Sequence, residues 1–363
     1  MAELKLLSLR LEMALVRNWW KGLGVLLVLG SITIGLLTKT GPGVAVVSPG
    51  VVDASSTFSF TLTGYNTDFY GESAPSVWLK YKDRLFCADA VLVEDIKTLR
   101  VSFPPFDHRI DTVSRIATSV LIEDEVNGMF LGLDALQLNF NEVAVDTTTG
   151  CSIRPDKLEA IKFQFPFRTT LYETIRNLNF HVPMWFAMIA VLFLSWIASI
   201  RNLNSGDRKW DHLAYGFATA GLLFGIAGIT TGAFWARFTW GTFWTADPKL
   251  NGAAIGVLLF VAYQILRASI DDEDKVARIS SVYNVLAFPI FIVLIIILPV
   301  LAKFSLHPGS GDSVGFKQYD LNNNLRMVFY PAVLGWVLVA TWVGQLISRV
   351  KAIEEEQEMN AHE

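Results

Sequence analysis

The chain has 363 residues, of which 52% are hydrophobic and only 18% are charged. Soluble domains carry about 25% charged residues, and here the shortfall is concentrated in long apolar runs, so the composition indicates a membrane protein. The formal net charge is −4. Without a basic excess, nucleic acid is not an implied partner.

Crossing a bilayer takes about 20 apolar residues, and six apolar stretches are candidates, of which the first is short. They cover 23–38, 182–200, 213–235, 250–266, 279–302 and 327–347, and none contains Asp, Glu, Lys, Arg or His. The first run lacks the usual small-residue cleavage site, so we interpret it as a retained anchor. With the N-terminus inside, the short inner segments carry 12 Lys and Arg against 5 outside. This bias predicts that residues 1–22 and the tail 349–363 are both cytoplasmic.

Residues 42–170, between the first two spans, show the period-2 alternation of half-buried strands. Apolar residues alternate at 58–62, 77–81, 99–103 and 161–167. The predicted fold is therefore a membrane all-α bundle of six transmembrane helices with an inserted periplasmic β-sandwich, of immunoglobulin-like type. Cys87 and Cys151 both lie in the insert. They either form a disulfide or remain buried thiols, and the sequence leaves both possibilities open.

Two histidines lie at span ends that are predicted to face outside. His181 precedes the second span, with Pro183 in the expected first helical turn, and His307 follows the fifth span. A single histidine at such a place is more often an interfacial polar residue than a metal ligand. Neither histidine is therefore informative alone.

The outer segment 235–249, between the third and fourth spans, is rich in aromatic residues. Tryptophan collects at membrane interfaces, so aromatic density alone indicates a belt. A belt does not explain Gly241 and Asp247-Pro248 at fixed offsets within the loop. Flat aromatic rings and two imidazoles on one face are typical of a site for a planar iron macrocycle.

The segment 240–247, Trp-Gly-x-x-Trp-x-x-Asp, resembles the tryptophan-rich signature of the membrane haem-handling proteins of cytochrome c maturation, the CcmC and CcsA types. Phe-His-Val-Pro at 180–183 and Leu-His-Pro-Gly at 306–309 resemble the family's histidine segments, and the CcmC type is the more similar. The resemblance covers about 175–348. The chain departs from the family at Phe243 and Ala246, where Trp is common, at Asn251-Gly252, and in the insert.

The resemblance implies a haem-handling membrane domain over 175–348. His181 and His307 would be the axial ligands of a non-covalent, bis-histidine haem b. The haem contacts would come from Trp240, Gly241, Phe243, Trp244 and Asp247. Arg237 and Lys249 flank the loop and would pair with the haem propionates, or else with lipid headgroups. We expect Asp247 to cap the next helix, since Pro248 suits its first position, and the alternative is that it orients a histidine.

The implied function is to bind haem at the outer face of a bacterial inner membrane and present it to a periplasmic haem chaperone. ABC-transporter subunits and membrane lipid would be further partners. The chain lacks a Gly-x-x-x-x-Gly-Lys-Ser/Thr phosphate loop, so partner subunits would hydrolyse ATP and the chain itself would not be an enzyme. The alternative is a transporter or channel with an external β receptor domain. Such proteins usually carry ionisable residues within their spans, and the predicted spans have none.

Overall fold

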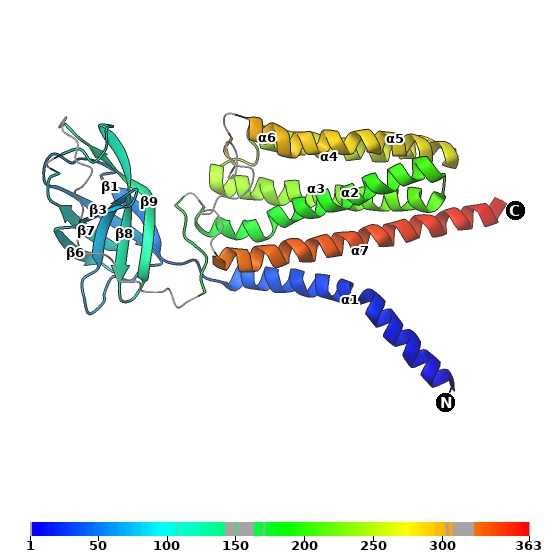
Figure 1. Ribbon diagram of the computed structural model, residues 1–363, viewed down its shortest axis with the longest axis horizontal. Helices are drawn as coiled ribbons and strands as arrows, with labels where there is room; N and C mark the ends of the chain where they lie inside the picture. Colours follow the sequence, from blue (N-terminus) through cyan, green and yellow to red (C-terminus); the bar gives the residue numbers. More distant parts are fainter. Residues whose placement is uncertain are drawn as a thin grey trace. The chain divides into compact units, whose positions relative to one another are not determined.

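The computed structural model of the protein describes residues 2–106, 108–141, 151, 163–169, 171–302, 305–307 and 323–362. The chain forms two compact units (Figure 1). The membrane unit comprises Met1–Leu37 and Thr174–Glu363, and the β unit comprises Thr38–Glu173. Each unit has a hydrophobic core of its own.

Six helical segments of the described chain are long and apolar enough to span a bilayer. The count of six confirms the predicted membrane all-α class. The first span is Asn18–Leu37 of α1 (Ala2–Leu37), and the second is Tyr172–Ser205, which contains η1 (Tyr172–Asn179) and α2 (His181–Ser205). The third and fourth are α3 (Arg208–Trp240) and α4 (Pro248–Ala268). The fifth is Glu273–Leu301, made of α5 (Glu273–Ile292), the π-helical η2 (Val293–Ile297) and α6 (Leu298–Leu301), and the sixth is Asn323–Asn360 of α7 (Asn323–His362).

The long helices of the membrane unit run side by side (Figure 1). α7 packs against α1, α2 and α3, while α2 packs against α3 and α5. Glycines on α3 let α2 approach closely. Cβ atoms built on four of them would each come within 3.0 Å of an α2 side chain; the pairs are Gly221 with Leu192, Gly225 with Met188, Gly228 with Trp185, and Gly232 with His181.

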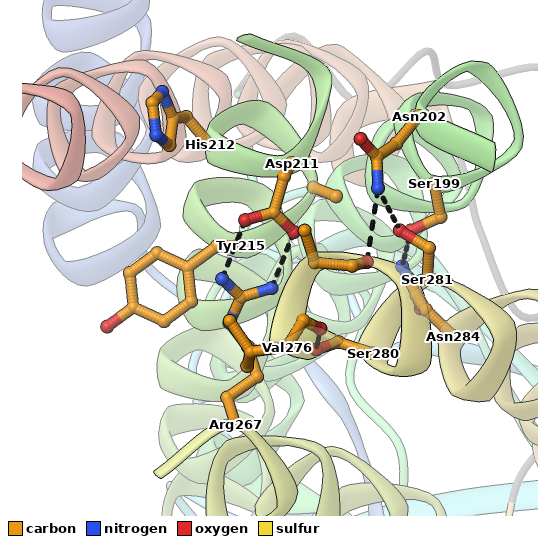
Figure 2. Close-up of polar contacts among 12 residues, drawn as sticks. Ser199, Asn202, Asp211, His212, Tyr215, Arg267, Val276, Ser280, Ser281 and Asn284 are labelled. Carbon is orange, nitrogen blue, oxygen red and sulfur yellow. Dashed lines mark hydrogen bonds and ion pairs between the residues drawn. The ribbon is translucent and has the colours of Figure 1, made fainter. Parts of the chain in front are cut away.

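Buried polar side chains join these helices near the C-terminal end of α2, which is the end far from His181. Figure 2 shows their contacts. Arg267 of α4 donates hydrogen bonds of 2.7 and 2.8 Å to the Asp211 carboxylate of α3, and its guanidinium lies 5.0 Å from the ring centroid of Tyr215. Asn202 of α2 donates to the Ser281 hydroxyl of α5 at 2.9 Å. The paired charges lie one or two residues beyond the apolar stretches from which the spans were predicted. Pairing makes such charges tolerable inside the bundle.

The β unit contains two sheets. The first has the order β1-β3-β7-β6 and is antiparallel throughout, and the second has the order β2-β9-β8-β4-β5, in which the β2–β9 pair is parallel. The strands are β1 (Gly43–Ser48), β2 (Val51–Asp53), β3 (Phe58–Tyr65), β4 (Ser76–Tyr81), β5 (Arg84–Cys87), β6 (Ala90–Asp95), β7 (Thr98–Phe103), β8 (Arg115–Asp124) and β9 (Gly128–Asn139).

Three of the four alternating segments are strands, namely β3, β4 and β7. Their inward side chains, such as Phe60, Leu79 and Val101, belong to a single core shared by both sheets. The prediction of a strand over 161–167 is wrong for its described part, because Phe165 makes only an isolated bridge with Thr40. Residues 161 and 162 lie outside the described residues.

The two cysteines of the β unit are joined. Cys87, the last residue of β5, forms a disulfide with Cys151, 64 residues further along the chain. Of the two possibilities that the sequence left open, the structure therefore contains the cross-link.

Candidate functional site

The aromatic loop starts where one helix is stopped and ends where the next is started. α3 ends at Trp240 because Gly241 follows in the left-handed conformation, with φ of 80°. α4 begins after Asp247, whose carboxylate accepts a hydrogen bond of 2.9 Å from the amide of Lys249. The fixed offsets of Gly241 and Asp247 are therefore a helix-stop and a helix-start signal, and the expected N-cap is present.

The Asp247 carboxylate also holds the segment 305–307. Its Oδ2 accepts hydrogen bonds of 2.8 Å from both the Ser305 hydroxyl and the Leu306 amide. Its Oδ1 lies 3.7 Å from Nδ1 of His307, beyond hydrogen-bonding range. Burial acts to raise the pKa of Asp247, but the hydrogen bonds from Ser305 and Leu306 outweigh it and the pKa is lowered. One ionised carboxylate thus caps α4 and lies beside a histidine.

The His307 ring packs against two tryptophans from the last turns of α3. Its centroid is 5.1 Å from that of Trp240 and 5.7 Å from that of Trp235, and the two indoles meet edge to face. Burial and the positive charge of Lys249 lower the pKa of His307 to about 4, although Asp247 acts to raise it. The imidazole is therefore neutral at physiological pH, which is the form that binds iron.

His181 is the first residue of α2, and α3 fixes its ring. The Nδ1 atom lies 2.9 Å from the carbonyl oxygen of Gly228 and 3.2 Å from Oγ1 of Thr231. Because a carbonyl only accepts, Nδ1 carries the proton and donates it, which leaves the Nε2 lone pair for another partner. A Cβ on Gly232 would lie 2.6 Å from Cε1 of the ring, so the ring occupies the space of the missing side chain.

Both histidine rings lie against the last turns of α3, although they are far apart in the sequence. His181 lies at Gly228 and Gly232, and His307 lies at Trp235 and Trp240. A charge on His181 is among the causes that lower the pKa of His307, as is the charge on Lys249. Nδ1 of His307 is buried and has no hydrogen-bond partner among the described residues. Two imidazoles, indole faces and a lysine therefore share one end of the bundle, an arrangement that can hold a planar anionic macrocycle.

Three other predicted site residues make contacts within the loop. Arg237 donates to the carbonyl of Gly241, and its guanidinium lies 5.9 Å from the ring centroid of Phe243. The Trp244 indole N–H donates to Oδ1 of Asn251 at 3.3 Å. Phe243 and Trp244 are 52% and 41% exposed. Within the described part of the chain, no hydrogen bond, ion pair or ring contact joins Arg237, Phe243 or Trp244 to either histidine.

Two residues that contact the imidazoles, Trp235 and Gly232, are not among the predicted site residues. Trp235 belongs to the aromatic segment 235–249 but not to the predicted haem contacts, and Gly232 lies inside the third predicted span. A usable signal existed, because His181 continues the helical spacing of Trp185, Met188 and Leu192 on α2, and the α3 glycines repeat that spacing. The matching pattern places Gly232 opposite His181.

A family model and several known proteins match the C-terminal part of the chain. The family model described as Heme exporter protein C (CcmC) matches residues 163–363, which include both histidines and the aromatic loop. The Heme exporter protein C of Rhodobacter capsulatus is 27% identical over 208 residues, covering 54% of this chain and 84% of the relative. Most of the β unit lies outside the family match.

Shorter alignments relate the chain to two further proteins. The Heme exporter protein C of Bradyrhizobium diazoefficiens is 31% identical over 110 residues, or 30% of this chain and 41% of the relative. The Cytochrome c biogenesis protein CcsA of Parasynechococcus marenigrum is 41% identical over 73 residues, or 20% of this chain and 23% of the relative. These two alignments span less than half of either relative.

Proposed function

Since the chain belongs to the Heme exporter protein C family, we propose that its membrane unit handles haem for cytochrome c maturation and binds it through His181 and His307. Family membership supports haem handling. The observation that supports these two ligands is that both imidazole rings lie against the last turns of α3, His181 at Gly228 and His307 at Trp235 and Trp240. In this proposal haem is the cargo of the protein, and the proposed role is delivery rather than catalysis.

The donor set fits haem. The hydrogen bond from Nδ1 of His181 to Gly228 leaves Nε2 for the iron, and such a backbone bond also raises the basicity of the ligand. Haem iron takes its equatorial ligands from the macrocycle, so two imidazoles complete a six-coordinate, low-spin centre. Among the described residues no group of three or more His, Cys, Asp or Glu side chains is arranged to hold a bare metal ion.

The remaining loop residues are proposed to hold haem b non-covalently. Trp240 packs on His307 and offers an indole face for the porphyrin, while Phe243 and Trp244 are exposed nearby in the chain. Lys249 acts on His307 electrostatically and suits a propionate. Arg237 already donates to the Gly241 carbonyl, and it retains further N–H groups for a second propionate.

We place the aromatic end of the bundle and the β unit on the periplasmic side of a bacterial inner membrane, with both termini in the cytoplasm. The distribution of Lys and Arg in the short loops supports this orientation. The disulfide suits an oxidising compartment, and two sheets with one shared core support a β-sandwich. The chain would present haem to a periplasmic haem chaperone, and ABC-transporter subunits would supply ATP hydrolysis.

One observation favours the alternative of a transporter or channel. Asp211 and Arg267 are ionisable residues buried in the spanning helices, and such residues often mark transport paths. Here the two charges neutralise each other in a bidentate salt bridge near the helix ends, an arrangement that joins α3 to α4. Solute movement without haem, in liposomes that contain the purified chain, would support the alternative.

Haem occupancy of the full chain purified in detergent tests the proposed function. We expect His181→Ala and His307→Ala each to lose most of the bound haem. The matched control is His212→Ala, because His212 pairs with Glu355 at the opposite end of the same bundle. Deletion of residues 45–165 should leave occupancy unchanged. Wild-type occupancy in both ligand variants would contradict the proposal.

A further inference from the structure

Three loops of the β unit meet at one end of its sheets. The loop between β3 and β4 bonds to the β6–β7 turn, where the Phe69 amide donates to the Ile96 carbonyl at 3.0 Å. It also bonds to the β8–β9 turn through Asn127, whose side-chain nitrogen donates to the Asp68 carbonyl at 2.8 Å and whose Oδ1 accepts from the Asp68 amide at 3.0 Å. We name the segments 66–72, 94–97 and 124–127 together the acidic loop end.

Each of the three loops exposes one large apolar side chain. Tyr70 is 64% exposed, Val126 is 51% exposed and Ile96 is 44% exposed. Phe69, next to Tyr70, is buried in the core and stacks on Phe130. Exposed aromatic and aliphatic side chains that are gathered on a rigid base are typical of the centre of a protein–protein interface.

The same surface is strongly acidic. The segments contain one lysine, Lys97, and six carboxylates, namely Asp68, Glu72, Glu94, Asp95, Asp124 and Glu125. Asp124 is buried, which leaves five carboxylates at the surface. One of them, Glu94, is paired with Arg100 of β7 at 2.5 Å. The amide of Lys97 lowers the pKa of Asp95, which keeps that group ionised. An excess of carboxylates around an apolar centre attracts a partner of opposite charge.

Aspartates hold the tips of all three loops in place. Asp68 accepts a hydrogen bond from the Tyr70 amide at 3.1 Å, Asp95 accepts one from the Lys97 amide at 2.7 Å, and Asp124 accepts one from the Val126 amide at 2.8 Å. Each is a turn in which the side chain bonds the backbone two residues on. Loops fixed in this way lose little conformational entropy when a partner binds.

We propose that the acidic loop end is a docking surface for a partner protein whose contact surface is basic and carries an apolar side chain among its lysines and arginines. Charge complementarity selects this occupant, because the five surface carboxylates repel anionic phospholipid headgroups and attract Lys and Arg. The inference goes beyond the proposed function and does not depend on it, since the proposed ligands His181 and His307 both belong to the membrane unit.

Site-specific photocrosslinking of the full chain in its native membrane tests the proposal. A photoreactive phenylalanine replaces Tyr70, or replaces Val113 as a control, because Val113 is 56% exposed and precedes β8, whose other end leads into the acidic loop end. We expect one defined protein adduct from position 70, with Lys and Arg in excess in the crosslinked peptide, and none from position 113. Glu72→Lys combined with Glu125→Lys should lower the yield about tenfold.

Several results would overturn the proposal. They are an adduct with phospholipid, an adduct within the same chain, an adduct with a peptide that is not basic, an equal yield from position 113, or no adduct at all. A retained Cys87–Cys151 disulfide on a non-reducing gel shows that each variant is folded, so a lost adduct reports on docking.

Discussion

Replacing Gly232 by alanine tests whether α3 positions the proposed ligand His181. The added Cβ would lie 2.6 Å from Cε1 and 3.1 Å from Nδ1 of the ring, whereas ordinary contact begins at 3.4 Å. The ring would therefore have to withdraw by about 0.8 Å. Such a shift would stretch the 2.9 Å hydrogen bond between Nδ1 and Gly228 beyond the usual range.

The size of the effect follows from two terms. Forcing an extra methyl group into a filled site costs about 1–3 kcal/mol. Loss of the hydrogen bond that orients a metal-bound histidine lowers metal affinity by about 10- to 100-fold. We therefore expect Gly232→Ala to bind haem about 10- to 100-fold more weakly than the wild type, with His307 still in place.

The assay is a haem titration of the detergent-purified full chain, followed by its Soret absorbance. Gly225→Ala is the matched control, since its Cβ would meet the flexible end of Met188 at 2.8 Å on the same face of α3. Gly30→Ala on α1 is a second control, because nothing lies within 4 Å of its added Cβ. Wild-type affinity in Gly232→Ala, or an equal loss in Gly225→Ala, would refute the reasoning.

Three further substitutions probe other parts of the chain. Asp247→Ala removes the cap of α4 and the hydrogen bonds that the carboxylate accepts from Ser305 and Leu306. Thermal unfolding should therefore show a free energy of unfolding that is lower by about 1 kcal/mol or more, and Asp247→Asn should lower it less. Arg267→Ala leaves Asp211 buried without its partner and should cost about 3–5 kcal/mol, and the double variant with Asp211→Ala should recover part of that loss in the same assay. Cys87→Ser should destabilise the β unit by about 2–5 kcal/mol in denaturant unfolding. Haem occupancy should stay at the wild-type level in Cys87→Ser, and a fall would mean that the two units depend on each other.

The spanning helices could be predicted because the lipid interior requires long apolar runs, and each such run is a continuous stretch of the sequence. Their polar ends could not be predicted from apolarity. Asp211 and Arg267 are 56 residues apart in the sequence, and only the packing of α3 and α4 shows that they neutralise each other. The error over 163–167 has a related cause, because alternation marks a half-buried segment, whereas a strand also needs a neighbouring strand to pair with.

In the candidate site, too, some features depend on neighbouring residues in the sequence and others depend on contacts between distant segments. Gly241 and Asp247 act through their own backbone neighbourhood, as a left-handed helix stop and an N-cap, so their offsets are readable in the sequence. The contact of His307 with Trp235 requires the segment 305–307 to be held by Asp247, about 58 residues away, and no local pattern reveals it. The tautomer of His181 likewise depends on a carbonyl of another helix.

Electron paramagnetic resonance of the ferric, haem-loaded full chain tests most directly whether His181 and His307 ligate the same iron. We predict a low-spin signal of bis-imidazole type in the wild type and a high-spin signal from the smaller amount of haem that each single alanine variant retains. Free imidazole should restore the low-spin signal of that retained haem. A low-spin signal that persists unchanged in either variant would contradict the account.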